Sequence, residues 1–181
     1  MTGVIVYKSK YGASRQYAEW LSEELLLPAL SPGIVTPGKL DDYKFLLIGG
    51  PVYIGKIKIR RWLVKNQQSL KNKKLFFFIV CATPSYRKEK LQQIADANIP
   101  AMLKKQSRVF FLHGRLNFKK LSWLDKLLLK TGAKLVKDPE EKKAMVTDFD
   151  DVKKENIREL VQEVRAWLYG KEEPAETTHI K

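Results

Sequence analysis

Cysteine and histidine are scarce in this sequence, which has one cysteine, Cys81, and two histidines, His113 and His179, among 181 residues. A single cysteine cannot form an internal disulfide, and these three residues are too few and too far apart for a Cys/His metal cluster. No hydrophobic run is long enough to span a membrane, and the first residues are typical of a strand rather than of a signal peptide. The sequence therefore predicts a cytoplasmic protein without a metal or a disulfide.

Acidic residues are too few to balance the basic ones. The sequence has 34 lysines and arginines against 20 aspartates and glutamates, which gives a formal net charge of +14. A surface of this sign attracts nucleic acid, anionic lipid or acidic small molecules. Aromatic residues interleaved along a basic strand, on which single-stranded nucleic acids stack, are lacking, so no nucleic-acid partner is expected. An anionic small molecule or an anionic membrane surface fits the charge better.

Short apolar strands alternate with amphipathic helical segments along the chain. Four apolar runs, typical of strands covered on both faces, lie at 4–7, 45–48, 75–80 and 109–112. One more brief strand is expected around Leu30, Ile34 and Val35. This order predicts an α/β fold with a doubly wound parallel five-stranded sheet. We expect one domain over residues 1–169, followed by a disordered tail at 170–181.

The loop Ser9–Ser14 joins the first predicted strand to the first predicted helix. The start of a helix offers free N–H groups and a partial positive charge, which suit a phosphate group. Gly12 allows a close approach of the backbone, and the hydroxyls of Ser9 and Ser14 add hydrogen-bond donors. The alternative is that Ser14 only caps the helix and Gly12 only forms a turn.

Two further loops follow buried strands, at Pro51–Gly55 and Ala82–Tyr86, and in a parallel sheet all three loops lie at one edge. Tyr53 and Tyr86 would hold a flat aromatic ring between them, unless both rings only cover loop backbone. A phosphate loop beside aromatic walls points to flavin mononucleotide (FMN). The predicted cofactor-binding residues are Ser9, Lys10, Tyr11, Gly12, Ala13, Ser14, Pro51, Val52, Tyr53, Ile54, Gly55, Ala82, Thr83, Pro84, Ser85 and Tyr86.

The segment 115–143 interrupts the alternation, because many lysines stand among its leucines. Its apolar residues between Leu121 and Leu129 have helical spacing. An amphipathic surface helix that faces lipid or a partner explains both the leucines and the lysines, whereas a helix packed on the domain explains the leucines alone. Both alternatives stay open. After this segment, Asp148 or Asp150 is expected to cap the last helix.

Three stretches of the chain resemble the flavodoxin-like family. They are residues 4–14 (VIVYKSKYGAS), 46–55 (LLIGGPVYIG) and 76–86 (FFFIVCATPSY), which correspond by position to the family's phosphate loop and two flavin-ring loops. The chain departs from ordinary flavodoxins at Tyr11 and Ser14, where those proteins usually have threonine. It also departs in charge, because ordinary flavodoxins are strongly acidic.

Three further features resemble one branch of this family, which includes the bacterial quinone-dependent protoporphyrinogen IX dehydrogenases. They are a GxLxY-like turn at 114–118, a W-x-D motif at 123–125 and a T-D-aromatic cluster at 147–149, together with the basic insertion itself. The resemblance covers nearly the whole chain, and the insertion is the part specific to this branch.

The resemblance implies an FMN-dependent oxidoreductase of haem biosynthesis. Such an enzyme would take electrons from a porphyrinogen-like substrate and pass them to a quinone, at the inner face of the cell membrane. Arg115, Lys119 and Lys120 would contact the substrate's carboxylates, and no catalytic residue is assigned. One alternative is a flavodoxin-type electron-transfer protein with an anionic redox partner. A second alternative is a cofactor-free basic binding module with the same fold.

Overall fold

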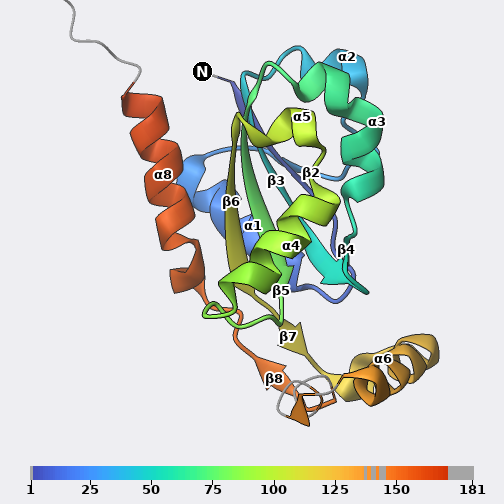
Figure 1. The fold of residues 1–181 in the computed structure, drawn as a ribbon. Helices are drawn as coiled ribbons and strands as arrows, with labels where there is room; N and C mark the ends of the chain where they lie inside the picture. The colour runs from blue at the N-terminus through green and yellow to red at the C-terminus, as the bar shows by residue number, and fades with distance from the viewer. Residues whose placement is uncertain (1, 137, 140–141, 143–145, 171–181) are drawn as a thin grey trace, which may run out of the picture.

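A mainly parallel sheet forms the centre of the computed structural model, which describes residues 2–136, 138–139, 142 and 146–170 (Figure 1). The strands are β1 (Gly3–Tyr7), β2 (Ala29–Leu30), β3 (Phe45–Tyr53), β4 (Lys56–Ile57), β5 (Lys74–Cys81) and β6 (Ser107–His113). Five of them are parallel in the order β2-β1-β3-β5-β6, and β4 pairs with β3 as an antiparallel hairpin. The predicted α/β fold with five parallel strands is confirmed.

Helices cover both faces of the sheet. They are α1 (Ala13–Leu25), α2 (Pro37–Leu40), α3 (Arg60–Leu70), α4 (Lys88–Asn98), α5 (Ala101–Lys104) and α8 (Arg158–Tyr169). Figure 1 shows α1 and α8 on one face and α3, α4 and α5 on the other. Chain connections therefore run on both sides of the sheet, and the loops that follow β1, β3 and β5 lie at one edge.

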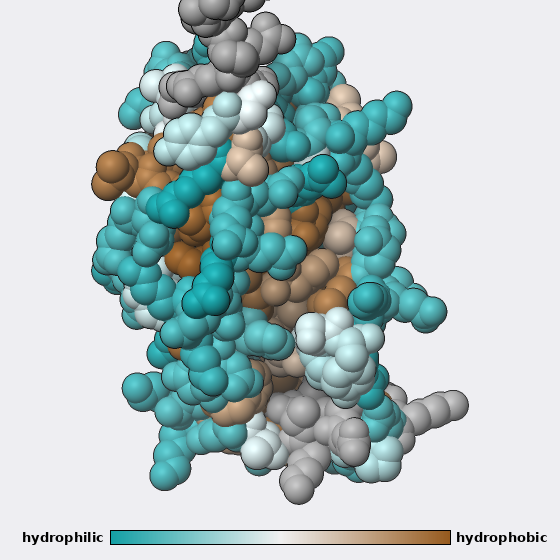
Figure 2. Space-filling view, turned by 90° about the vertical axis from the view of Figure 1, so that its left-hand side faces the viewer, coloured by the Kyte–Doolittle hydropathy of each residue, from teal (hydrophilic) through white to brown (hydrophobic). Residues whose placement is uncertain are grey.

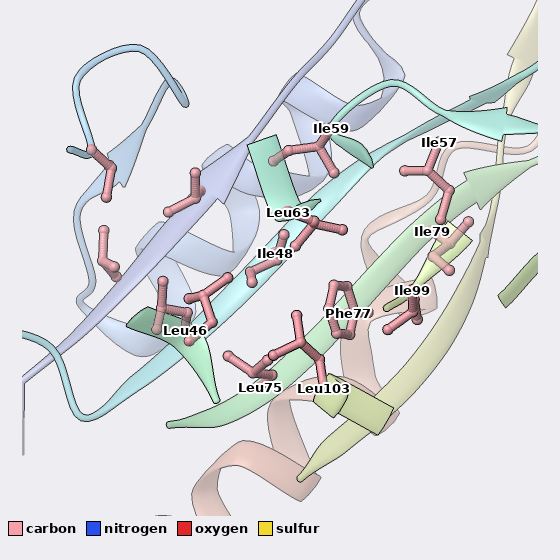
Figure 3. Packing of buried hydrophobic residues seen from close by; sticks show 14 of the residues in the cluster. Leu46, Ile48, Ile57, Ile59, Leu63, Leu75, Phe77, Ile79, Ile99 and Leu103 are labelled. Atoms are coloured by element: carbon pink, nitrogen blue, oxygen red, sulfur yellow. The ribbon is translucent and has the colours of Figure 1, made fainter. Parts of the chain in front are cut away.

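Residues of the inner strands alternate between two hydrophobic clusters, one on each face. In β5, Phe76 and Phe78 belong to the cluster under α1 and α8, whereas Phe77 and Ile79 belong to the cluster under α3, α4 and α5. Figure 3 shows the second cluster, in which side chains of β3 and β5 meet those of the helices. Because successive strand side chains point to opposite faces, a strand covered on both faces must be apolar throughout.

Gly49 in β3 leaves the space that the ring of Phe78 fills. A Cβ atom at position 49 would lie 2.0 Å from the nearest atoms of that ring, which is fully buried. We therefore expect Gly49→Ala to lower the free energy of unfolding of the protein by about 1–3 kcal/mol, the usual cost of overpacking. Chemical denaturation measures this loss. In the control variant Gly33→Ala the added Cβ meets open space, so an equal loss there would contradict the packing argument.

The second strand is shorter than predicted. It ends at Leu30, and Ile34 and Val35 lie outside it, in and just after a turn. Val35 is buried even so, because it packs in the cluster under α3, and Ile34 is half exposed. The apolar residues at 34 and 35 therefore do not mark a strand. They reflect the packing of the Val35 side chain alone.

The predicted cap of the last helix is wrong. α8 begins at Arg158, directly after a 3₁₀ turn at Lys154–Ile157, and neither Asp148 nor Asp150 caps it. An oxygen of Asp148 accepts a hydrogen bond from the Phe118 N–H at 2.7 Å, and Asp150 accepts one from the Val152 N–H at 3.1 Å. Asp148 therefore stabilises the insertion, and Asp150 stabilises the segment through which the chain returns to the domain.

The insertion lies at the edge of the sheet where β3 and β5 end (Figure 1). It contains β7 (Arg115–Leu116), a 3₁₀ turn (Phe118–Lys120), α6 (Trp123–Leu135) and β8 (Phe149–Asp150). β7 and β8 pair antiparallel, so the chain leaves the domain and returns to it at one place. Three residues after β8, the chain enters the 3₁₀ turn Lys154–Ile157 and resumes the domain with α8.

The side of the molecule that carries α8 and β6 is mostly hydrophilic, with hydrophobic residues gathered in the middle of the face (Figure 2). β6 pairs only with β5 among the described strands, and its Val109, Phe110 and Phe111 are partly buried. No helix among the described residues has the length and apolar character needed to cross a membrane.

Candidate functional site

A cavity of about 210 Å³ lies at the edge of the sheet where the three predicted loops meet. The predicted cofactor residues that line it are Ser9, Lys10, Tyr11, Ala13, Ser14, Pro51, Val52, Tyr53 and Ala82. The predicted residues that do not line it are Gly12, Ile54, Gly55, Thr83, Pro84, Ser85 and Tyr86. The structure thus brings the first two loops together around one space, and the third loop contributes only its first residue.

The first loop presents a free hydroxyl at the start of α1. Gly12 has a φ of 90°, in the left-handed region that favours glycine, and its N–H donates to the Ser9 Oγ at 3.2 Å. The helix begins at Ala13, and no side chain caps it. Ser14 is 1% exposed, and its Oγ has no hydrogen-bond partner among the described residues. The alternative that Ser14 caps the helix is therefore not what the structure shows, and the hydroxyl remains for a ligand.

The second loop is the hairpin between β3 and β4. Its turn is formed by Ile54 and Gly55, with φ values of 50° and 67°. A left-handed conformation is uncommon for a β-branched residue such as Ile54. The turn ends the contribution of this loop to the cavity, and Tyr53, the last residue of β3, lies at the cavity wall.

The third loop turns away from the cavity after Ala82. Tyr86 is 70% exposed and lies outside the cavity, so it does not face Tyr53 across it. Arg87, at the start of α4, forms an ion pair with Asp138 in the segment after α6. This loop therefore contacts the insertion, and its predicted role as an aromatic wall does not appear in the geometry.

Residues that the sequence analysis did not assign to the site supply much of the cavity wall. They are Val80, Cys81, Gly114, Leu116, Leu121, Asp125, Leu129 and Phe149. Burial raises the pKa of the Cys81 thiol. Asp125, Leu129 and Ala133 are spaced four residues apart on the inner side of α6, and Leu121 continues this spacing just before the helix begins. That spacing is the signal that could have found them, because an aspartate stands within an apolar helical stripe.

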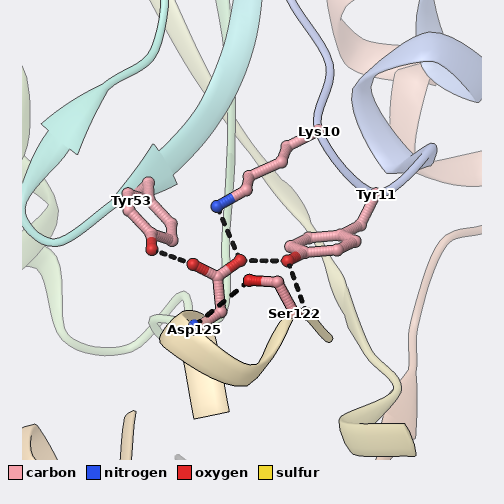
Figure 4. Close-up of polar contacts among 5 residues, drawn as sticks. All are labelled: Lys10, Tyr11, Tyr53, Ser122 and Asp125. Atoms are coloured by element: carbon pink, nitrogen blue, oxygen red, sulfur yellow. Dashed lines mark hydrogen bonds and ion pairs between the residues drawn. The ribbon is translucent and has the colours of Figure 1, made fainter. Parts of the chain in front are cut away.

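Asp125 is the centre of a polar cluster (Figure 4). One of its oxygens lies 2.6 Å from the Lys10 Nζ and also accepts a hydrogen bond from the Tyr11 hydroxyl. The other oxygen accepts one from the Tyr53 hydroxyl. The backbone N–H of Asp125 donates to the Ser122 Oγ at 3.2 Å, so Ser122 caps α6. A single carboxylate on the insertion thus contacts both the first loop and the second loop.

The charge of this carboxylate is stabilised although it is only 3% exposed. Burial acts against ionisation, but the hydrogen bonds from Lys10, Tyr11 and Tyr53 outweigh it and hold the pKa of Asp125 well below its usual range. The hydrogen bond to Asp125 is in turn the main cause of the raised pKa of Tyr53. Asp125 is therefore a carboxylate at neutral pH, and Tyr53 keeps its proton to donate.

The three predicted substrate residues lie in different surroundings. Arg115 lines the cavity and also an adjoining hollow of about 450 Å³, which Lys120 lines as well. The Nε atom of Arg115 is buried without a hydrogen-bond partner among the described residues, and its Nη1 lies 3.5 Å from an Asp150 oxygen. Lys119 lines neither space, and its carbonyl accepts a hydrogen bond from the Lys126 Nζ at 3.3 Å.

Comparison with protein-family models identifies the chain. Residues 4–143 match the model described as "Flavodoxin domain". The chain belongs to the flavodoxin domain family. A search of curated proteins gave no match. The branch of protoporphyrinogen dehydrogenases is not distinguished by the family match, so the assignment stops at the flavodoxin domain.

Several solved structures are similar to this flavodoxin domain. The rubredoxin oxygen:oxidoreductase of Desulfovibrio gigas is 12% identical over 92% of this chain and 37% of its own length, with a TM-score of 0.45. A WrbA-like flavodoxin of Agrobacterium tumefaciens is 19% identical over 61% of this chain and 82% of its own, with a TM-score of 0.41. A flavodoxin from an archaeon is 15% identical over 61% of this chain and 85% of its own, with a TM-score of 0.41. This chain thus spans about a third of the length of the Desulfovibrio protein.

Family membership implies that the cofactor is FMN, and the residues of the site fit it. The buried Ser14 Oγ and the N–H groups at the start of α1 would hold the phosphate. Apolar side chains that line the cavity, such as Leu116, Leu129 and Phe149, suit the flavin ring. The family match and the residues of the site thus both support FMN binding, and the cofactor-free alternative is no longer supported.

Proposed function

We propose that this flavodoxin domain is an FMN-dependent oxidoreductase that oxidises an anionic, porphyrinogen-like small molecule and passes the electrons to a quinone. When bound, FMN supplies the redox chemistry, because it can take electrons from a reduced substrate and release them to an acceptor. The observation that carries the proposal is the hollow of about 450 Å³ beside the flavin cavity. Arg115 lines both spaces, so a substrate held there reaches the flavin site.

The side chains of this hollow suit a molecule that is apolar and carries carboxylates. Leu116, Leu121 and Phe149 offer apolar contact, and Arg115 and Lys120 offer positive charge. Two carboxylates also line the hollow: Asp148 accepts the Phe118 N–H, and Asp150 pairs with Arg115. The buried Nε of Arg115 needs an acceptor, which a carboxylate supplies through a charge-assisted hydrogen bond. We therefore assign substrate binding to Arg115 and Lys120, and not to Lys119.

The outer side of α6 supports an association with an anionic membrane. Trp123, Leu124, Leu127 and Leu128 are 72%, 51%, 55% and 45% exposed, and they form an apolar strip with lysines along one side and in the turn before the helix. Those lysines are Lys119, Lys120, Lys126, Lys130 and Lys134. An apolar strip flanked by lysines is typical of helices that lie in a lipid interface. We propose that the protein binds the inner face of the cell membrane there, where a quinone is within reach.

We expect the FMN-loaded protein to oxidise protoporphyrinogen under anaerobic conditions when a quinone is present. Product fluorescence measures the rate. The variant Arg115→Met should raise KM about tenfold or more, because a hydrogen bond between charged groups contributes roughly 1.5–3 kcal/mol. Arg158→Met on the distant α8 is the matched control and should leave KM unchanged. No oxidation by the parent protein would contradict the proposed function, and an unchanged KM in the variant would contradict the role of Arg115.

A second candidate function is that of an electron-transfer protein with an acidic partner. The observation that favours it is a basic hollow of about 470 Å³, whose charged residues are Lys8, Lys56, Lys58, Arg60 and Arg61. Tyr53 lines both this hollow and the flavin cavity, and the Lys58 Nζ lies 4.3 Å from the centre of its ring. An acidic protein docked there would be close to the flavin. Bleaching of the flavin by protoporphyrinogen, which a pure electron carrier would not show, distinguishes the two functions.

A further inference from the structure

We propose that Asp125 is a positioning residue that fixes the walls of the flavin cavity by joining two flavin loops to the insertion. The proposal concerns the flavin site and not the substrate, so it can fail or hold independently of the proposed function. Its basis is a juxtaposition that no local pattern requires: one carboxylate on α6 contacts Lys10 and Tyr11 of the first loop and Tyr53 of the second.

A merely local role for Asp125 does not explain these contacts. The sequence Ser122–Asp125 resembles a capping box, in which the carboxylate would turn back to the start of its own helix. Here the Ser122 Oγ already accepts the Asp125 N–H, and both carboxylate oxygens accept hydrogen bonds from residues outside the insertion. The carboxylate therefore holds α6 against the domain and is not needed to cap it.

The contacts also set the direction of two aromatic side chains. The Tyr11 hydroxyl donates to Asp125 and accepts the Ser122 N–H at 3.3 Å, so both ends of this hydrogen-bond chain lie on the insertion. The Tyr53 ring lies 4.0 Å from the Lys10 Nζ, which Asp125 also binds. Both rings line the flavin cavity, so movement of Asp125 would displace two of its walls together.

Asp125 also sets the charge beside the flavin. Among the described residues that line the cavity it is the only acidic one, and Lys10 balances it. Removal of either partner leaves one uncompensated charge at the cavity wall. Asp125 is buried, where electrostatic interactions are strong, and the Lys10 side chain is 31% exposed. A negative charge opposes the addition of electrons to the flavin and a positive charge favours it. The two partners should therefore affect the reduction potential in opposite directions.

The first test measures the reduction potential of bound FMN by spectroelectrochemical titration. We expect Asp125→Asn to make the potential less negative and Lys10→Met to make it more negative, with the double variant closer to the parent protein than either single variant. A residue that only supported the fold would not give opposite shifts. Shifts of the same sign, or no shift in either variant, would overturn the proposal.

The second test needs no cofactor and measures the cleavage of the insertion by trypsin. The sites include Lys119, Lys126 and Lys130. Asp125→Asn should make cleavage in the FMN-free protein several-fold faster, and the same increase should persist after FMN is bound. Tyr53→Phe, which keeps the charge and removes one hydrogen bond, should give a smaller increase in the same sense. If Asp125→Asn does not fold, the cleavage rate of Tyr53→Phe alone decides the test.

The matched control is Asp96→Asn, which removes an exposed ion pair with Lys104 far from the insertion and should leave cleavage unchanged. Cleavage in Asp125→Asn at the rate of the parent would overturn the proposal. So would rapid cleavage of the parent once FMN is bound, because the Asp125 contacts would then belong to the cofactor-free protein alone and could not position the walls around the cofactor.

Discussion

Ser14→Ala should weaken FMN binding about tenfold to a hundredfold and leave the FMN-free protein as stable as before. The Ser14 Oγ is buried and has no partner among the described residues, so its removal breaks no contact within them. In the loaded protein the same hydroxyl would donate to the phosphate, and a hydrogen bond to a charged group contributes roughly 1.5–3 kcal/mol. Addition of the protein to FMN, monitored by the quenching of flavin fluorescence, gives the dissociation constant.

The exposed Ser31 supplies the matched control, since Ser31→Ala makes the same chemical change away from the site. A second variant, Gly12→Val, should also weaken FMN binding. Its cause differs, because a β-branched side chain at a φ of 90° strains the loop although the space around Gly12 is open. If Ser14→Ala bound FMN as tightly as the parent and Ser31→Ala, the phosphate would not lie at the start of α1.

Charge reversal on the insertion should abolish binding to anionic vesicles. The parent protein should sediment with vesicles that contain anionic lipid at low salt, and much less with neutral vesicles. The triple variant Lys126→Glu, Lys130→Glu, Lys134→Glu should bind on the order of a hundredfold more weakly, since each basic residue near the surface contributes about 1 kcal/mol. Salt should weaken binding by the parent, because ions screen the attraction. FMN binding should be unchanged in this variant.

The same change of net charge at the opposite edge of the sheet provides the control. Lys44, Lys71 and Lys105 are exposed and precede β3, β5 and β6, so they lie away from the insertion. Their replacement by glutamate should leave vesicle binding close to that of the parent. If both triple variants lost binding equally, the net charge and not α6 would be responsible. If the parent did not bind anionic vesicles at all, the exposed leucines of α6 would contact another protein or a second copy.

The sequence by itself determined the sheet and the edge of the sheet at which a ligand would lie. Apolar runs such as 45–48 and 75–80 can bury all of their side chains only when both faces of the sheet are covered. This requires a parallel sheet between helices. Strand followed by glycine-containing loop and helix then places Ser9–Ser14 at the edge where the strands end. These features follow from local patterns, in which period and residue type suffice. For the same reason the family resemblance was visible in the loops.

Only the tertiary structure decided how the third loop and the insertion take part. Tyr86 has the residue type of an aromatic wall, but the course of its loop leaves it 70% exposed. Asp125 has the sequence surroundings of a helix cap, yet it contacts Tyr11 and Tyr53, which are 114 and 72 residues away. A contact at such separation depends on where the insertion leaves and rejoins the sheet. No periodicity within α6 records that place, because the helical spacing shows only that Asp125 shares one side of the helix with Leu129 and Ala133. Which residues of the domain that side contacts became known only with the fold.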